Sequence, residues 1–141
     1  MKTAMIRVPA DATVFILEDS SVRLRWFCER IQHLRYSSTV EQALEILSSM
    51  PRDSFLFLDH DLNWLDAAGR KPGSGVRVAH FVSKMGFTGR AIIHSVNEEG
   101  VLEMKRWLPK AEVHPFGSFE IERSTRTVPV RQNERQLQIA E

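Results

Sequence analysis

Five short strand-like runs alternate along the chain with longer segments of mixed hydrophobic and polar character. The runs are residues 13–17, 35–38, 55–58, 90–93 and 111–113. The first reads Thr-Val-Phe-Ile-Leu and the third Phe-Leu-Phe-Leu, so both are apolar at almost every position. Such a run predicts a strand buried on both faces, because a surface strand would alternate apolar and polar residues.

The segments between the runs carry the end signals of helices. They are residues 22–34, 40–50, 76–85 and 98–108. Thr39 with Gln42 three positions later indicates a capping box, and Asn97 is a candidate cap for the last helix. Gly86 suits the left-handed residue that ends the third helix. Strands that alternate with helices predict an α/β fold, a doubly wound sheet of five parallel strands.

The phase of the first helix follows from its apolar positions. Ser20 or Ser21 can cap it, and we expect Val22, Trp26 and residues 28–31 to face the core. Among the other aromatic side chains, we expect Trp107 to be core, whereas Trp64 is a candidate to contact a nucleobase. His33 and His80 fall within helical patterns and are interpreted as structural.

We expect one domain, residues 13–122, between an N-terminal extension, residues 1–12, and a polar C-terminal tail, residues 123–141. We expect the tail to be ordered only where a partner or the second subunit of a homodimer covers it. The glycine-bearing loop of residues 63–75 is long enough to be functional, and a mobile surface insertion is the alternative.

Composition limits the classes of function. The chain has 141 residues and a net charge of +1, so it offers no broad basic surface for nucleic acid or anionic membrane. Its single cysteine permits neither an internal disulfide nor a thiolate zinc site, which is compatible with a cytoplasmic location. Residues 1–10 lack the apolar segment of a signal peptide, and no apolar run approaches the roughly 20 residues of a membrane span.

Titratable side chains follow four of the five predicted strands directly. They are Glu18 and Asp19 after the first, Asp59, His60 and Asp61 after the third, His94 and Ser95 after the fourth, and His114 after the fifth. Ligands of open parallel sheets bind beyond the carboxyl ends of the strands. We therefore predict that these side chains form one site.

The four carboxylates, Glu18, Asp19, Asp59 and Asp61, are candidate ligands of a divalent metal ion. Several carboxylates cannot all remain charged in one crevice without a cation or a strongly raised pKa. Oxygen ligands favour Mg²⁺ or Mn²⁺, and the neighbouring histidines keep Zn²⁺ as a third choice. The alternative is that Glu18 and Asp61 only cap helices or pair with arginines, for which Arg23, Arg25 and Arg70 are the candidates.

The histidines and the polar residues after the fourth strand are candidates for catalysis and phosphate binding. His94 could act as general base or acid, with His60 or His114 as its counterpart. Ser95 and Asn97 could bind a phosphate oxygen. The alternatives are a buried His94 that donates to a backbone carbonyl, a Ser95 that only fills a turn and an Asn97 that is only a helix cap.

With these positions in place, residues 13–121 resemble the receiver domain of two-component response regulators. Leu17-Glu18-Asp19 resembles its acidic pair, Phe57-Leu58-Asp59 its phosphoacceptor strand and Ile93-His94-Ser95 the strand with its switch hydroxyl. His114-Pro115-Phe116 stands where that family has lysine, proline and an aromatic residue. The resemblance implies a flavodoxin-like sheet of order 2-1-3-4-5. It also implies a metal held by Asp19, Asp59 and the main chain at Asp61, with Glu18 acting through water.

Two motifs resemble a divergent branch, the cyclic-phosphate-processing receiver domains, more closely. They are Asp59-His60-Asp61-Leu62 and His94-Ser95-Val96-Asn97, the second followed by Gly100. Asn63 replaces the usual glycine, and the loop after it is longer than in that branch. His114 in place of lysine and His60-Asp61 after the aspartate both depart from ordinary receivers.

Three functions follow as hypotheses. The first is a metal-dependent phosphodiesterase or phosphohydrolase acting on the cyclic or terminal phosphate of a nucleotide or RNA end. In it, Asp19, Asp59, Glu18 and Asp61 hold the metal, and His94, His60, His114 and Asp59 act in catalysis. The second is a signalling receiver phosphorylated on Asp59. The third is an inactive pseudo-receiver that binds a protein partner.

Overall fold

The computed structural model describes residues 3–62 and 74–123, and its centre is a parallel sheet. The strands are β2 (Val14–Leu17), β3 (Arg35–Ser37), β4 (Phe55–Leu58), β5 (Arg90–Ile93) and β6 (Glu112–Val113). They pair in the order β3-β2-β4-β5-β6. Counted by themselves, these strands have the predicted order 2-1-3-4-5, so the predicted fold class is confirmed.

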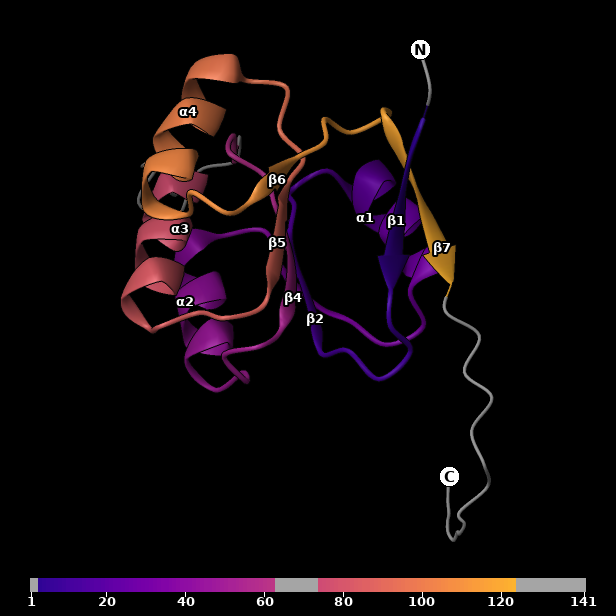
Figure 1. The fold of residues 1–141 in the computed structure, drawn as a ribbon, viewed down its shortest axis with the longest axis horizontal. Helices are drawn as coiled ribbons and strands as arrows, with labels where there is room; N and C mark the ends of the chain where they lie inside the picture. The colour runs from indigo at the N-terminus through magenta and orange to yellow at the C-terminus, as the bar shows by residue number, and fades with distance from the viewer. Residues whose placement is uncertain (1–2, 63–73, 124–141) are drawn as a thin grey trace, which may run out of the picture.

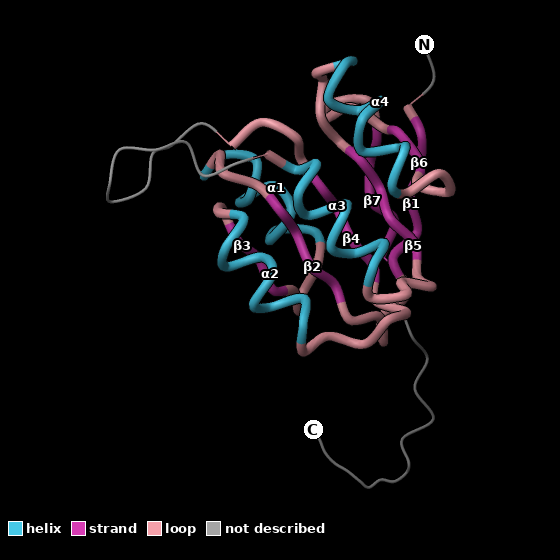
Figure 2. The backbone as a smooth tube through the Cα atoms, turned by 90° about the vertical axis from the view of Figure 1, so that its left-hand side faces the viewer, coloured by secondary structure: helices cyan, strands magenta, loops and turns pink. Residues whose placement is uncertain are grey.

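Three helices cover one face of this sheet. They are α2 (Val40–Ser48), α3 (Gly75–Lys84) and α4 (Glu98–Trp107). Figure 1 shows them on one side of the strands, and Figure 2 looks onto this helical layer with the strands behind it. Alternate strand residues such as Leu17, Leu58 and Ile93 are buried beneath them.

The other face is covered by α1 (Ser21–Arg30) and by a two-stranded parallel ribbon, β1 (Ala4–Val8) with β7 (Phe119–Arg123). Ile6 lies opposite Ile121 in this ribbon, and both are buried against Phe57 and its neighbours. No strand was predicted at either place. The segment predicted as an N-terminal extension therefore contains β1, and β7 ends one residue beyond the predicted domain boundary.

Several local predictions are confirmed by hydrogen bonds or backbone angles. The Thr39 hydroxyl accepts the Gln42 N–H at 3.1 Å, and the Asn97 side chain accepts the Gly100 N–H at 3.0 Å. Ser20 is the cap of α1. Gly86 has a φ of 76°, the left-handed conformation expected where the third helix ends.

The predicted phase of α1 was wrong. Val22 is 77% exposed and Cys28 is exposed, whereas Phe27 is fully buried. The helix ends at Arg30 instead of residue 34, and Ile31 is already extended. The reason is the aromatic cluster on this face, in which Phe27 packs against Phe57 with ring centroids 5.0 Å apart. Because successive helical residues differ by about 100° in direction, burying Phe27 turns Cys28 outward.

Other single-residue predictions also need correction. Trp26 packs against the core as predicted, but Trp107 is 39% exposed and rests on the exposed His80 ring, 4.3 Å away. His33 is exposed and follows α1 instead of lying within it. Trp64, Arg70, most of the 63–75 loop and all but the first residue of the predicted tail lie outside the described residues. Among the described helices, none is long and apolar enough to cross a membrane.

Candidate functional site

The ends of the central strands are in register. Beyond the strands themselves, the Asp59 N–H donates to Leu17 O at 3.1 Å and the His94 N–H to Leu58 O at 3.0 Å. Similarly, the His114 N–H donates to Ile93 O at 3.0 Å. Because side chains alternate along strands, Glu18, Asp59 and His94 point to the face that carries α1. The backbone ladder thus places all three at one level of the sheet.

Glu18, Asp59 and His94 form a compact buried group. One potential metal-ligand atom from each lies within 4.8 Å of the others. The three residues are 1%, 3% and 0% exposed. His94 Nε2 lies 2.8 Å from Glu18 Oε1, and the Ser20 N–H donates to Glu18 Oε2 at 3.0 Å. Two carboxylates and an imidazole have therefore been removed from water together, which is costly without a compensating cation or proton.

His94 has a second ring nitrogen without a hydrogen-bond partner. Its Nδ1 is buried, and no group in the described part of the chain bonds to it. Phe27 packs edge-on against the ring with centroids 5.4 Å apart, which fixes the ring's position. The carbonyl contact considered for His94 is replaced by the Glu18 carboxylate. The two carboxylates suit Mg²⁺ or Mn²⁺, and the buried imidazole nitrogen suits Mn²⁺ or Zn²⁺, so these residues fit a divalent ion.

The pKa of the Asp59 carboxyl is raised to about 6. Burial is the main cause that raises its pKa from 3.8 to about 6, and the charge of Glu18 acts in the same direction. His94, the backbone N–H of His60 and Arg23 act in the opposite direction. The His60 N–H donates to Asp59 Oδ1 at 2.9 Å. A carboxyl with such a pKa exchanges a proton for a metal ion readily around neutral pH.

A second cluster lies beside the buried group. His60 Nδ1 is 2.7 Å from Asp61 Oδ1, and the Asn97 side-chain amide donates to the same oxygen at 3.2 Å. Asn97 thus caps α4 and also contacts Asp61. Because Asp61 fixes Nδ1 as the donor, the Nε2 of His60 is left as the nitrogen able to accept a proton.

Two glycines allow the Asp59-His60 backbone and the His60 ring to lie close to the helices. A Cβ on Gly75 would lie 2.0 Å from Asp59 O, and a Cβ on Gly100 would lie 2.3 Å from Cγ of the His60 ring. The Gly75 N–H also donates to His60 O at 2.9 Å. The starts of α3 and α4 therefore hold the end of β4 through contacts that no larger residue would permit.

The remaining predicted site residues lie at the edges of these clusters. Asp19 is half-buried next to Glu18 and is not part of the close group. Ser95 is buried, and its hydroxyl accepts the Asn97 N–H at 3.0 Å, a local turn contact. His114 Nε2 lies 3.3 Å from Glu112 Oε1. Arg90 donates to the same carboxylate at 2.8 Å, so His114 belongs to a separate chain of charged groups.

Arg23 also lies in this region, although the sequence suggested it only as a candidate ion-pair partner of Glu18 or Asp61. Its guanidinium carbon lies 5.3 Å from the centroid of the Phe116 ring. Its charge also lowers the pKa of Asp59. The available signal was its place three residues after Ser20, in the helical turn that begins at the carboxyl edge of the sheet.

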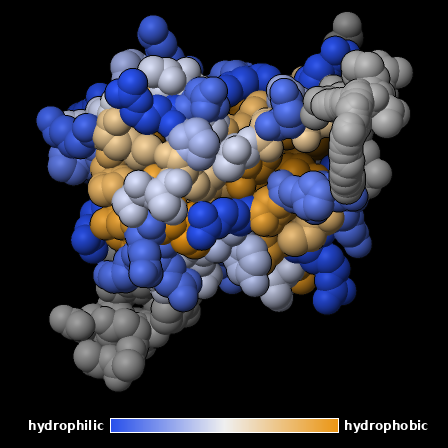
Figure 3. Space-filling model, turned by 90° about the horizontal axis from the view of Figure 1, so that it is seen from below, coloured by the Kyte–Doolittle hydropathy of each residue, from blue (hydrophilic) through white to orange (hydrophobic). Residues whose placement is uncertain are grey.

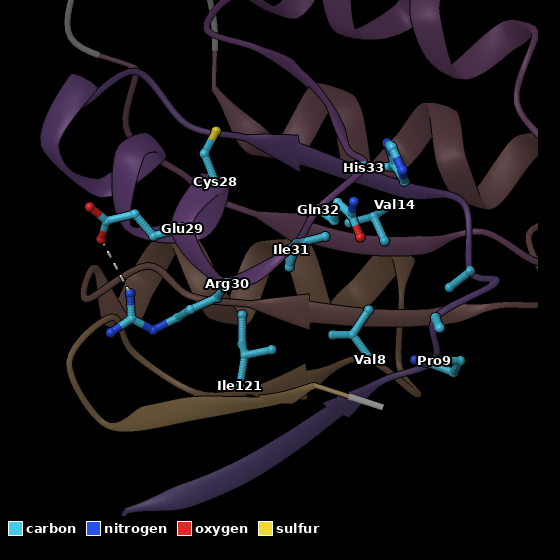
Figure 4. A pocket seen from close by; sticks show the side chains of 12 residues that line it. Val8, Pro9, Val14, Cys28, Glu29, Arg30, Ile31, Gln32, His33 and Ile121 are labelled. Atoms are coloured by element: carbon cyan, nitrogen blue, oxygen red, sulfur yellow. Dashed lines mark ion pairs between the residues drawn. The ribbon is translucent and has the colours of Figure 1, made fainter. Parts of the chain in front are cut away.

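A separate cavity of about 490 Å³ lies at the opposite, amino-terminal end of the sheet. Figure 4 shows its apolar floor, which includes Val8, Val14 and Ile121. Glu29 and Arg30 pair at its rim, 3.7 Å apart. Figure 3, seen from below, shows that apolar side chains reach the surface at this end of the molecule. None of the buried acidic group lines this cavity.

Comparison with known protein families identifies a matching family. A family model described as the cyclic-phosphate processing receiver domain matches residues 16–110, which include Glu18, both halves of the His60–Asn97 cluster and His94. No curated protein and no solved structure matches the chain.

Proposed function

The chain belongs to the family of cyclic-phosphate processing receiver domains, and from this premise we propose that it is a metal-dependent phosphodiesterase or phosphohydrolase. The proposed substrate is the cyclic or terminal phosphate of a nucleotide or an RNA end. The observation that carries the proposal is the buried group of Glu18, Asp59 and His94. We further propose that the protein acts in the cytoplasm.

Glu18, Asp59 and His94 are the residues proposed to hold the metal ion, with Asp19 beside them. A bound divalent ion would neutralise phosphate charge and lower the pKa of a bound water. The proposal for His94 shifts from proton transfer to ligation, because its ring is fully buried against Glu18. The protein's part is to keep these ligands fixed and out of bulk water.

His60 is the residue proposed to transfer the proton. Asp61 orients its ring, Asn97 donates to the Asp61 carboxylate, and Gly100 gives the ring room against α4. With Nδ1 bonded to Asp61, Nε2 can accept a proton from an attacking water and return it to the leaving oxygen. This arrangement of carboxylate, imidazole and reacting group orients the base by the same principle as hydrolytic triads.

The direct experiment uses the purified protein with Mn²⁺ or Mg²⁺ and 2′,3′-cyclic nucleotides, followed by RNA that ends in a cyclic phosphate. We expect hydrolysis to a monophosphate, abolished in Asp59→Asn and lowered by about 10²–10⁴-fold in His60→Gln. The exposed Asp53→Asn is the matched control. Absence of turnover by the wild-type protein, or equal turnover by Asp59→Asn, contradicts the proposal.

Phosphorylation of Asp59 is the second candidate function, because receiver domains define the family and Asp59 directly follows the central strand β4. Incubation with a small phosphodonor and Mg²⁺ would then add one phosphoryl group to the wild-type protein and none to Asp59→Asn. Intact-mass spectrometry distinguishes this function from hydrolysis, which leaves the mass of the protein unchanged.

A further inference from the structure

Arg23 is tied to the buried acidic group through the start of α1. The Arg23 N–H donates to the Ser20 hydroxyl at 3.3 Å, and the Ser20 N–H donates to Glu18 Oε2 at 3.0 Å. The helix cap and the site carboxylate thus share one short backbone segment. The backbone of this first turn is therefore held close to Glu18.

The guanidinium of Arg23 is held by an aromatic face. It lies over the Phe116 ring, 5.3 Å from the centroid. The Phe116 N–H donates to His94 O at 2.9 Å, so this ring is itself anchored at the end of β5. A cation–π contact uses the flat face of the guanidinium and leaves its N–H donors, which lie in its plane, available.

The charge of Arg23 is not neutralised by a carboxylate of the described residues. Arg7, Arg30, Arg77 and Arg90 each form an ion pair, whereas within residues 3–62 and 74–123 no ion pair involves Arg23. Phe27 packs against both the Phe116 ring, at 6.1 Å, and the His94 ring, at 5.4 Å, so the Arg23–Phe116 pair lies beside the buried group. The charge of Arg23 also lowers the pKa of Asp59. A half-buried cation of this kind beside acidic groups suits an anion that binds between them.

His114 does not supply this cation. It occupies the position where ordinary receivers have a lysine, but its Nε2 contacts Glu112, which Arg90 already binds. We propose that Arg23 binds the phosphate group at this site, donating N–H bonds to the oxygens that do not react. The ligand class is a phosphate monoester or a cyclic phosphodiester. This inference rests on the proposed function and names the residue that recognises its substrate.

The test compares Arg23→Gln and Arg23→Lys with Arg25→Gln, a variant of an exposed arginine on the same helix. Orthophosphate in the presence of Mn²⁺ is the probe, and calorimetry gives its Kd. We expect Arg23→Gln to raise that Kd at least about tenfold and Arg23→Lys to raise it less, because lysine keeps the charge but loses bidentate bonding. Arg25→Gln should bind phosphate like the wild type.

Mn²⁺ affinity, measured by electron paramagnetic resonance, should not be lower in Arg23→Gln, because the loss of a nearby positive charge does not weaken the binding of a cation. A retained Mn²⁺ affinity separates phosphate binding from damage to the metal ligands. Equal phosphate Kd values for wild type and Arg23→Gln overturn the inference. So does an equal loss in Arg25→Gln, or a wild-type protein that binds no phosphate.

Failures of the two proposals are distinguishable. Turnover of a cyclic nucleotide with the same KM in wild type and Arg23→Gln leaves the proposed function standing and removes the role of Arg23. Phosphate binding that depends on Arg23, without turnover of any cyclic phosphate, supports the role of Arg23 and contradicts the proposed hydrolytic function. If both hold, Arg23→Gln should raise KM for the cyclic nucleotide more than it lowers kcat.

Discussion

At the scale of single residues, Asp59 links the stability of the protein to pH. Its pKa of about 6 lies above the ordinary value of 3.8, mainly because of burial. A raised pKa means that the folded state holds the proton more tightly than the unfolded state. The stabilisation by protonated Asp59 is therefore complete below about pH 4 and is lost as the pH rises through about 6. Above that range, a charged Asp59 costs roughly 3 kcal/mol in the metal-free protein.

We predict that Asp59→Asn stabilises the metal-free protein at about pH 7, by up to roughly 3 kcal/mol, and changes little at about pH 4. The amide oxygen can still accept the His60 N–H, so the main hydrogen bond survives. Urea unfolding at both pH values measures the effect, with the exposed Asp53→Asn as control. An increase in the free energy of unfolding that is equal at both pH values would falsify the electrostatic explanation. Mn²⁺ should raise the Tm of the wild type and leave that of Asp59→Asn unchanged.

A second prediction at the residue scale concerns the effect of replacing Gly100 on the stability of the protein. Alanine is the better helix former by about 1 kcal/mol, but its Cβ would lie 2.3 Å from the His60 ring. We expect the clash to dominate, so that Gly100→Ala destabilises the protein by about 1–3 kcal/mol.

The matched test of this clash is a double-mutant cycle with His60→Ala. Once the ring is removed, Gly100→Ala should become neutral or stabilising, because only the helix propensity remains. Chemical denaturation of the four proteins supplies the cycle, and Glu99→Ala, an exposed neighbour, is the control. A Gly100→Ala penalty that persists without the His60 ring would rule out the contact as its cause.

The residue scale also shows what the sequence could disclose about the site. Strand-end positions identified Glu18, Asp59 and His94, because polar residues directly after buried strands meet at one edge of the sheet. The bond between Glu18 and His94 spans 76 positions and depends on rotamers and tertiary packing, which no local pattern encodes. The same holds for Arg23, whose place over Phe116 requires the end of β6 to fold back toward α1.

At the scale of elements, the buried strands were predictable and the ribbon was not. A short, continuously apolar run, as in β2 and β4, is typical of a strand that is buried on both faces. β1 and β7 are mixed in character, because only alternate residues such as Ile6 and Ile121 are buried. Their apolar residues form a continuous buried face only when the two distant strands pair. Likewise, the predicted phase of α1 was wrong because Phe27 and Cys28 are adjacent and both apolar. Only tertiary packing determines which of the two side chains points toward the sheet.

The ribbon should contribute directly to stability. Ile6 is 1% exposed, whereas its neighbour Met5 is 57% exposed. We therefore predict that Ile6→Ala costs about 2–5 kcal/mol through lost burial and a residual cavity. Met5→Ala, a truncation of an exposed side chain in the same strand, should change the free energy of unfolding by no more than about 0.5 kcal/mol. Equal effects of the two substitutions in urea titrations would show that the ribbon does not pack as described.

At the scale of the whole molecule, the ribbon joins the two ends of the described chain. Arg7 and Glu122 form an ion pair across it although they are 115 positions apart. The five-stranded sheet, by contrast, pairs strands that are much closer along the chain, such as β2 with β3 and β4 with β5. The five-stranded sheet is therefore held together by contacts of shorter range along the chain. The β1–β7 ribbon, which pairs the two ends of the described chain, packs onto this sheet.

This difference predicts an order of events in folding. Pairing β1 with β7 requires closing the longest loop in the domain. The entropic cost of this loop closure arises before the paired strands can stabilise the folded state. We expect the ribbon to form after the rate-limiting step, so that Ile6→Ala mainly accelerates unfolding and has a φ-value near zero. Leu56→Ala, in the central strand β4, should instead slow folding. Stopped-flow folding and unfolding in urea separates the two effects. If Ile6→Ala slows folding in proportion to its loss of stability, the termini pair early and the ribbon belongs to the folding nucleus.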